Sequence, residues 1–224
     1  KLHFRHILSG VPEIGGRYSA LSNFGIVPAA LMGLPIDQFL GQAERMRHSC
    51  EASVPAQENP GVVLGTALGM LAKSGRDKLT FVTSPALWNL GAWLEQLVAE
   101  STGKEDKGII PVEGESVDVP QVYGQDRVFA YIRYEQGADP KQDAAIKTLE
   151  EAGHPVIRVA VGDLINLGQE FFLWEMATAV AGAMLGINAF DQPNVQESKD
   201  YTKAHLETFK KEGTLAESTP ILAD

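Results

Sequence analysis

The strongest constraint on the fold is a regular alternation of short apolar segments and longer helical segments between residues 78 and 185. Four segments have the length and apolar content of buried strands, namely residues 78–83, 108–112, 127–133 and 155–161. Three of them are followed by helical segments, over residues 87–102, 140–152 and 167–185. Because strands alternating with helices of this length favour parallel pairing, we expect an α/β fold, with a three-layer αβα sheet of about five strands.

The chain divides into three parts around this alternation. Residues 1–75 are expected to form a helical lead-in, residues 76–186 the α/β domain, and residues 187–224 a polar motif with a helical tail. Helices are predicted outside the α/β domain over residues 17–34, 35–52, 59–74 and 201–212. The acidic and polar residues 113–126 predict a loop.

Three glycines in the lead-in, Gly61, Gly65 and Gly69, recur every four residues and therefore share one helix face. A phosphate-binding loop and close packing between helices are two interpretations of this pattern. The residues between the glycines are apolar, which favours close packing.

Composition excludes several classes of protein. The net charge of −10 argues against nonspecific nucleic-acid binding, which depends on clustered Lys and Arg. Cys50 is the only cysteine, so no intrachain disulfide can form, and this usage fits a reducing cytoplasm. No apolar run reaches the roughly 18 residues expected of a membrane span. The five histidines lack metal-ligand spacing and no dinucleotide-binding motif follows a strand, so we expect neither metal nor cofactor.

The chain starts at Lys1 without an initiator Met and without a signal-peptide pattern. We therefore expect it to be a piece of a longer protein.

Two motifs in the first half of the chain carry candidate chemistry. Arg17 follows two glycines that permit close backbone approach, so Gly16 is a candidate substrate-binding residue and Arg17 could stabilise an oxyanion. Glu100 lies in the last turn of its helix, where the negative end of the helix dipole disfavours a carboxylate and favours proton uptake. Gln96 lies one turn earlier and could bind a hydroxyl group. Alternatively, Arg17 is a surface arginine in a turn and Glu100 is a solvated glutamate at a helix end.

Two further pairs of candidate functional residues lie in the second half of the chain. Gln192 and Lys199 are seven residues apart, so a helix starting at Pro193 would aim both the same way. Lys199 could act as a movable cation, or it could be an ordinary solvated lysine. Gln169 and Glu170 open the helix after residue 168, where helix propensity alone also favours a carboxylate.

Taken together, these motifs resemble phosphoglucose isomerase. Residues 15–19 are similar to that family's Gly-Gly-Arg-aromatic-Ser element, residues 96–104 to its Gln-x-x-x-Glu-Ser-x-Gly-Lys segment, and residues 190–199 to its C-terminal Phe-Asp-Gln-x-x-Val-x-x-x-Lys signature. The three motifs occur in the family's order over about 185 residues. The sequence of residues 171–182, together with that of residues 191–195, further resembles the subgroup fused behind a transaldolase.

The resemblance implies roles in the interconversion of glucose 6-phosphate and fructose 6-phosphate. Glu100 would shuttle a proton between C1 and C2 through an enediolate, and Arg17 would stabilise the oxyanion. Gln96 and Gln192 would lie beside the sugar, and Lys199 would assist ring opening.

The resemblance also implies what this chain lacks. Family members have two sugar-isomerase (SIS) domains, and the Ser/Thr-rich phosphate cradle belongs to the first, whereas this chain corresponds to the second. Glu170, with Gln169, stands where better-known members have the ring-opening histidine. We therefore expect a folded but inactive fragment whose partners are the missing N-terminal domain, a transaldolase domain of the same polypeptide and a second subunit.

Two other functional classes of protein are also compatible with the sequence. A noncatalytic sugar-phosphate-binding domain would bind the substrate without exchanging its protons with solvent. A structural domain would use the apolar helix over residues 167–185 for assembly.

Overall fold

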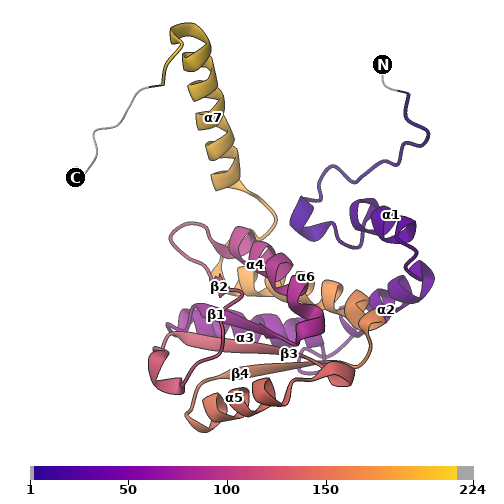
Figure 1. The fold of residues 1–224 in the computed structure, drawn as a ribbon, viewed down its shortest axis with the longest axis vertical. Coiled ribbons are helices and arrows are strands. Elements are labelled where there is room, and N and C mark those ends of the chain that lie inside the picture. Colours follow the sequence, from indigo (N-terminus) through magenta and orange to yellow (C-terminus); the bar gives the residue numbers. More distant parts are fainter. Residues whose placement is uncertain (1–2, 216–224) are drawn as a thin grey trace. The chain divides into compact units, whose positions relative to one another are not determined.

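The computed structural model describes residues 3–215 and contains a parallel four-stranded sheet in the order β2-β1-β3-β4 (Figure 1). Its strands are β1 (Lys78–Thr83), β2 (Ile110–Val112), β3 (Arg127–Tyr134) and β4 (Val156–Val161). The register pairs Lys78 of β1 with Ile110 of β2 and with Arg127 of β3. All four expected strand segments form, and the α/β class is confirmed.

The expectation of about five strands is wrong, because the described residues form four. Residues 113–126 contain only a short 3₁₀ turn, Pro120–Val122 (η3), and the lead-in forms helices rather than strands.

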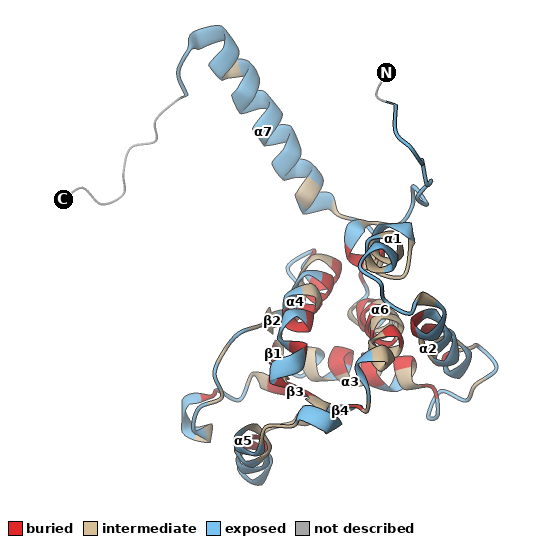
Figure 2. Cartoon of the chain, turned by 45° about the vertical axis from the view of Figure 1, so that its right-hand side comes forward, coloured by how far each residue is buried: buried red, intermediate tan, exposed pale blue. Residues whose placement is uncertain are grey.

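Helices cover both faces of the sheet and enclose two apolar cores (Figure 2). The larger core lies between one face and three helices, α3 (Pro60–Lys73), α4 (Trp88–Thr102) and α6 (Leu167–Leu185). The smaller core lies between the other face and α5 (Pro140–Glu151). Since α6 contacts both α3 and α4, it is apolar around most of its circumference.

The lead-in departs from the predicted helix over residues 17–34. A 3₁₀ turn, η1 (Gly16–Tyr18), is followed by two separate helices, α1 (Asn23–Leu31) and α2 (Ile36–Ser49). Ser22 separates η1 from α1 because its side chain accepts a hydrogen bond from the Phe24 backbone amide at 3.2 Å and so caps α1.

The glycines of α3 are packing positions. A Cβ at Gly65 would lie 2.4 Å from the Ala177 carbonyl oxygen of α6, and one at Gly69 would lie 2.6 Å from Met184 Cβ. The absence of side chains on this face therefore lets α3 and α6 approach closely, as the four-residue spacing indicated.

The chain forms two units, one reaching Phe190 and the other starting at Asp191. The second unit is built around α7 (Pro193–Glu212), which begins at the predicted proline and continues through the expected helix of residues 201–212 without a break. Within residues 3–215, none of the helices is both long and apolar enough to span a bilayer.

Candidate active site

The centre of the candidate site is Arg17, a charged side chain that is almost completely buried in the first unit. Its Nε donates to Ser101 Oγ at 2.7 Å, and its Nη2 donates to the Ala189 carbonyl oxygen at 2.8 Å. The 3₁₀ turn η1 thus holds the guanidinium against the end of α4 and the segment after α6. A planar guanidinium suits this arrangement because its donors point in fixed, different directions.

Glu100 lies directly beside this guanidinium. Glu100 Oε2 is 3.5 Å from Arg17 Nη1, and the Glu100 side chain is 32% exposed whereas that of Arg17 is fully buried. Gln96, one turn earlier on α4, donates from Nε2 to Glu100 Oε1 at 3.2 Å. The structure therefore brings together three of the predicted residues, which come from two motifs far apart in the sequence.

Neighbouring groups fix Arg17 from other sides. Trp93 Nε1 donates to the Arg17 carbonyl oxygen at 3.1 Å, and the Tyr18 hydroxyl donates to Ser101 Oγ at 3.1 Å. Burial raises the pKa of Tyr18 above its usual value, so this hydroxyl stays protonated and can donate. A fixed cation beside a solvent-accessible carboxylate can support proton abstraction next to an oxygen that gains negative charge.

Sequence reasoning missed three groups at this site: Ser101, Trp93 and the carbonyl of Ala189. Ser101 follows Glu100 in the same motif, and Trp93 precedes it by two helical turns, so both could have been found from their position on α4. The Ala189 carbonyl carries no sequence signal, since any residue offers the same backbone group.

Gly16 and Gln169, two other predicted residues of the first unit, have different surroundings. Gly16 adjoins open space in the described part of the chain, because a Cβ built there would meet nothing within 4 Å. Gln169 donates to the Gln42 side chain of α2.

Glu170 occupies a buried position near the start of α6 and is 4% exposed. It precedes Trp174 by one helical turn, and the Trp174 ring packs edge-on against Phe81 of β1, with ring centroids 5.5 Å apart. Glu170 therefore lies on the sheet side of α6. Burial raises its pKa to about 7, so the carboxyl group can exchange a proton near neutral pH.

Gln192 and Lys199 belong to the second unit. Gln192 is the residue that precedes the first turn of α7, and its carbonyl oxygen accepts from the Gln196 amide at 3.1 Å. Lys199 is exposed on the same helix, about two turns further on.

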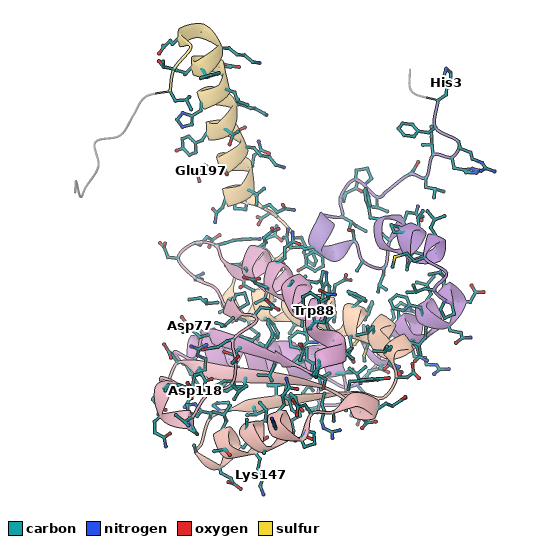
Figure 3. The ribbon with its side chains drawn as sticks, viewed as in Figure 1. His3, Asp77, Trp88, Asp118, Lys147 and Glu197 are labelled. Atoms are coloured by element: carbon teal, nitrogen blue, oxygen red, sulfur yellow. The ribbon has the colours of Figure 1, made fainter. Side chains whose placement is uncertain are left out.

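The Arg17–Glu100 pair is remote from the carboxyl edge of the sheet, where α/β proteins usually bind ligands. A cavity of about 570 Å³ lies at that carboxyl edge and is lined in part by Thr83, Trp88 and Gln142. The end of α4 lies at the other edge, because Ala99 lines a smaller cavity together with Asp77. Asp77 precedes β1 and Trp88 follows it in sequence, and the two residues lie well apart in Figure 3.

No group of three or more metal-ligating side chains occurs among the described residues.

Solved structures share this fold. A hypothetical protein from Thermus thermophilus superposes with a TM-score of 0.75 at 23% identity, over 87% of this chain and 56% of that protein. A glucose-6-phosphate isomerase from Chlamydia trachomatis superposes with a TM-score of 0.68 at 18% identity, over 88% of this chain and 48% of that protein. The chain therefore belongs to the class of α/β proteins with a helix-covered parallel sheet of this topology.

Two curated proteins that share a name are similar to this chain in sequence. The chain is 33% identical to the glucose-6-phosphate isomerase of Rubrobacter xylanophilus, over 87% of this chain and 54% of the relative. It is 28% identical to the glucose-6-phosphate isomerase of Parabacteroides distasonis, over 95% of this chain and 56% of the relative. No protein-family model matches the chain. The chain spans about half the length of the curated relatives it matches.

Proposed function

We propose that the complete protein containing this chain is an aldose–ketose isomerase that interconverts glucose 6-phosphate and fructose 6-phosphate. The observation that carries the proposal is the Arg17–Glu100 pair, in which a buried guanidinium lies 3.5 Å from a partly exposed carboxylate. The name shared by the relatives supports the same substrate class.

The central step is proton transfer between C1 and C2 of the open-chain sugar. Glu100 removes the proton from one carbon, which leaves a cis-enediolate, and then returns it to the other carbon, while the hydroxyl proton passes between O2 and O1 so that the carbonyl group changes place. Arg17 stabilises the negative oxygen of this intermediate, and its fixed charge supplies no proton that would compete with the transfer. Gln96 holds the Glu100 carboxylate at one oxygen and leaves the other beside Arg17.

Ring opening precedes this step, and its proton transfers are assigned to groups in the second half of the chain. Lys199 supplies a cation, and Gln192 and Gln169 are the amides that bind sugar hydroxyls in this proposal. Glu170 is the second candidate proton donor, since its pKa of about 7 allows it to give and take a proton near neutral pH.

The proposal extends to the parts of the protein beyond this chain. An N-terminal SIS domain supplies the phosphate cradle, a transaldolase domain belongs to the same polypeptide, and two copies form a dimer. The share of the relatives that this chain spans supports a further part of comparable size in the complete protein.

The substitution Glu100→Gln in the complete protein tests the assignment. Removing the base should lower kcat by at least about a thousandfold, because the amide cannot accept the proton, while the fold stays intact. The measurement is turnover of fructose 6-phosphate, with far-UV circular dichroism as the check on folding. Glu95→Gln is the matched control, since Glu95 is an exposed carboxylate on the same helix.

Exchange of substrate hydrogen with solvent distinguishes an isomerase from a protein that only binds the sugar phosphate. An isomerase incorporates solvent deuterium at C1 or C2 of the sugar, whereas a noncatalytic sugar-phosphate-binding protein does not. Near-wild-type turnover in Glu100→Gln, or no exchange in the wild type, would refute the proposed function.

A further inference from the structure

Lys104 is a buried lysine near the candidate site that has no role in the proposed reaction. It lies just beyond the end of α4, the helix that carries Glu100, and is 6% exposed. A lysine is almost never buried this fully unless its ammonium group is paired. Here Nζ donates to the carbonyl oxygen of Asn188, 84 residues further along the chain. The buried ammonium group therefore joins the end of α4 to the segment after α6.

Residues 187–190 form the segment that accepts this hydrogen bond. The Ile187 amide donates to the Gly182 carbonyl oxygen at 3.0 Å, a contact that closes the end of α6. The Phe190 amide donates to Asn188 Oδ1 at 3.0 Å. Hydrogen bonds thus hold this short segment at both of its ends.

The carbonyl group of Ala189, in the middle of this segment, belongs to the candidate site because it accepts from Arg17 Nη2 at 2.8 Å. Each peptide group is planar, so the orientation of this carbonyl follows from the two peptide groups that flank Ala189. Lys104 holds the group before it through the Asn188 carbonyl oxygen. The group after it contains the Ala189 carbonyl itself and the Phe190 amide, which Asn188 Oδ1 binds. Lys104 and Arg17 therefore bind successive carbonyl groups of one fixed segment.

A tight turn holds the backbone of Lys104. Its amide donates to the Lys107 carbonyl oxygen at 3.1 Å, and the Lys107 amide donates back at 2.9 Å. The two residues between them, Glu105 and Asp106, have φ values of 54° and 58°, as in a two-residue hairpin turn of type I′. A glutamate in this conformation is uncommon, so the turn contains local strain. The reward for this strain is a lysine whose backbone is fixed directly after α4.

We propose that Lys104 is a positioning residue for Arg17: by binding the Asn188 carbonyl oxygen, it keeps the Ala189 carbonyl in the direction that holds the guanidinium. With Nε on Ser101 and Nη2 on Ala189, the remaining nitrogen, Nη1, faces Glu100 at 3.5 Å. The inference rests on the proposed function, in which Arg17 stabilises the enediolate. Lys104 acts through two backbone carbonyl groups and not on the sugar.

The first test is the substitution Lys104→Met in the complete protein, which removes the ammonium group and keeps an unbranched side chain. A guanidinium that is no longer held in one direction stabilises the enediolate less well but leaves the binding of the sugar phosphate intact. We therefore expect kcat to fall about tenfold, with KM within about twofold of wild type. Lys107→Met is the matched control, because Lys107 is an exposed lysine of the same turn, and it should keep kcat within about twofold.

Binding of two ligands distinguishes positioning from a general structural role. A five-carbon aldonate phosphate has a carboxylate that resembles the charge of the enediolate, whereas a six-carbon polyol phosphate has the length of the substrate and no such charge. Titration calorimetry should show that Lys104→Met weakens binding of the aldonate phosphate about tenfold and changes binding of the polyol phosphate less than about twofold. A loosened fold would weaken the binding of both ligands.

Wild-type kcat in Lys104→Met, or an equal loss of affinity for the two ligands, overturns the positioning role. If Lys104→Met does not fold, Lys104→Gln decides, because its polar amide is one bond too short to replace the ammonium group. It should weaken binding of the aldonate phosphate selectively, by about threefold, and unchanged binding overturns the proposal. Loss of the fold in both variants shows a structural role instead. Wild-type protein without isomerase activity refutes the proposed function, whereas an active wild type with an unaffected Lys104→Met refutes only the role of Lys104.

Discussion

At the scale of single residues, the structure sets two acidic groups in different electrostatic environments. Glu100 is a partly exposed carboxylate that pairs with Arg17 and accepts a hydrogen bond from Gln96. Glu170 is buried on the sheet side of α6, and burial raises its pKa. One environment supports a charged base, and the other supports a group that titrates near neutrality.

The Glu170 environment predicts a specific dependence of stability on pH. The pKa is raised from 4.5 to about 7, so the folded state binds the proton more tightly than the unfolded state. The resulting stabilisation is complete below about pH 4.5 and is lost as the pH rises through about 7, a change of about 3 kcal/mol. Replacement by Gln removes the titration, so Glu170→Gln should gain stability relative to wild type as the pH rises.

Urea denaturation of wild type and Glu170→Gln at pH 5 and pH 8.5 measures this difference directly. The control is Glu95→Gln, whose carboxyl group is exposed, and its stability relative to wild type should not change between the two pH values. An equal difference between Glu170→Gln and wild type at both pH values would contradict the buried environment.

Residue patterns predicted some of the site and missed the rest for identifiable physical reasons. The spacing of Gln96 and Glu100 along one helix face is local, so their contact follows from helix geometry. The meeting of Arg17 with Glu100 depends on how η1 packs against α4, which the residues themselves did not predict and only the family resemblance implied. Ser101 could have been found from its place after Glu100 on α4, whereas the Ala189 carbonyl was missed because its role exists only once η1 meets the segment after α6.

At the scale of elements, the boundaries of the strands and helices in the α/β region were predicted within a few residues. These segments show a clear alternation of short apolar runs and longer helical patterns. The lead-in was predicted less well over residues 17–34, because Ser22 caps a new helix and breaks the apolar run. The helix α6 is the element that organises the site. Its faces contact α3, α2 and α4, and the segment after it supplies Ala189.

Close packing of α3 on α6 predicts opposite effects for two glycine substitutions. Gly65→Ala should destabilise the protein by about 1–3 kcal/mol, because its Cβ would lie 2.4 Å from a backbone carbonyl oxygen of α6. Gly41→Ala in α2 is the matched control, because a Cβ there meets nothing within 4 Å. Its better helix propensity should stabilise the protein by up to about 1 kcal/mol. Chemical denaturation measures both, and a stabilising Gly65→Ala would rule out the packing role.

At the scale of the whole molecule, the chain contains continuous apolar cores, whereas its site is incomplete in the proposed function. Both faces of its sheet are covered by helices, and the buried residues form continuous clusters in the first unit. The chain nevertheless spans about half the length of its curated relatives. A core of this size supports folding, whereas binding of the substrate phosphate depends on residues that the chain lacks in the proposed function.

The last prediction is that the isolated chain folds but does not catalyse the reaction. Interactions with the phosphate group, remote from C1 and C2, supply binding energy that lowers the barrier at the reacting carbons, so their loss should reduce kcat/KM by at least about a thousandfold. Turnover of fructose 6-phosphate is compared between the isolated chain and the complete protein, and a cooperative thermal transition shows that the chain is folded. Addition of the missing N-terminal half as a separate polypeptide should restore part of the activity, because Arg17 and Glu100 are already paired. Turnover by the isolated chain within about tenfold of the complete protein would mean that the phosphate is held by this half alone.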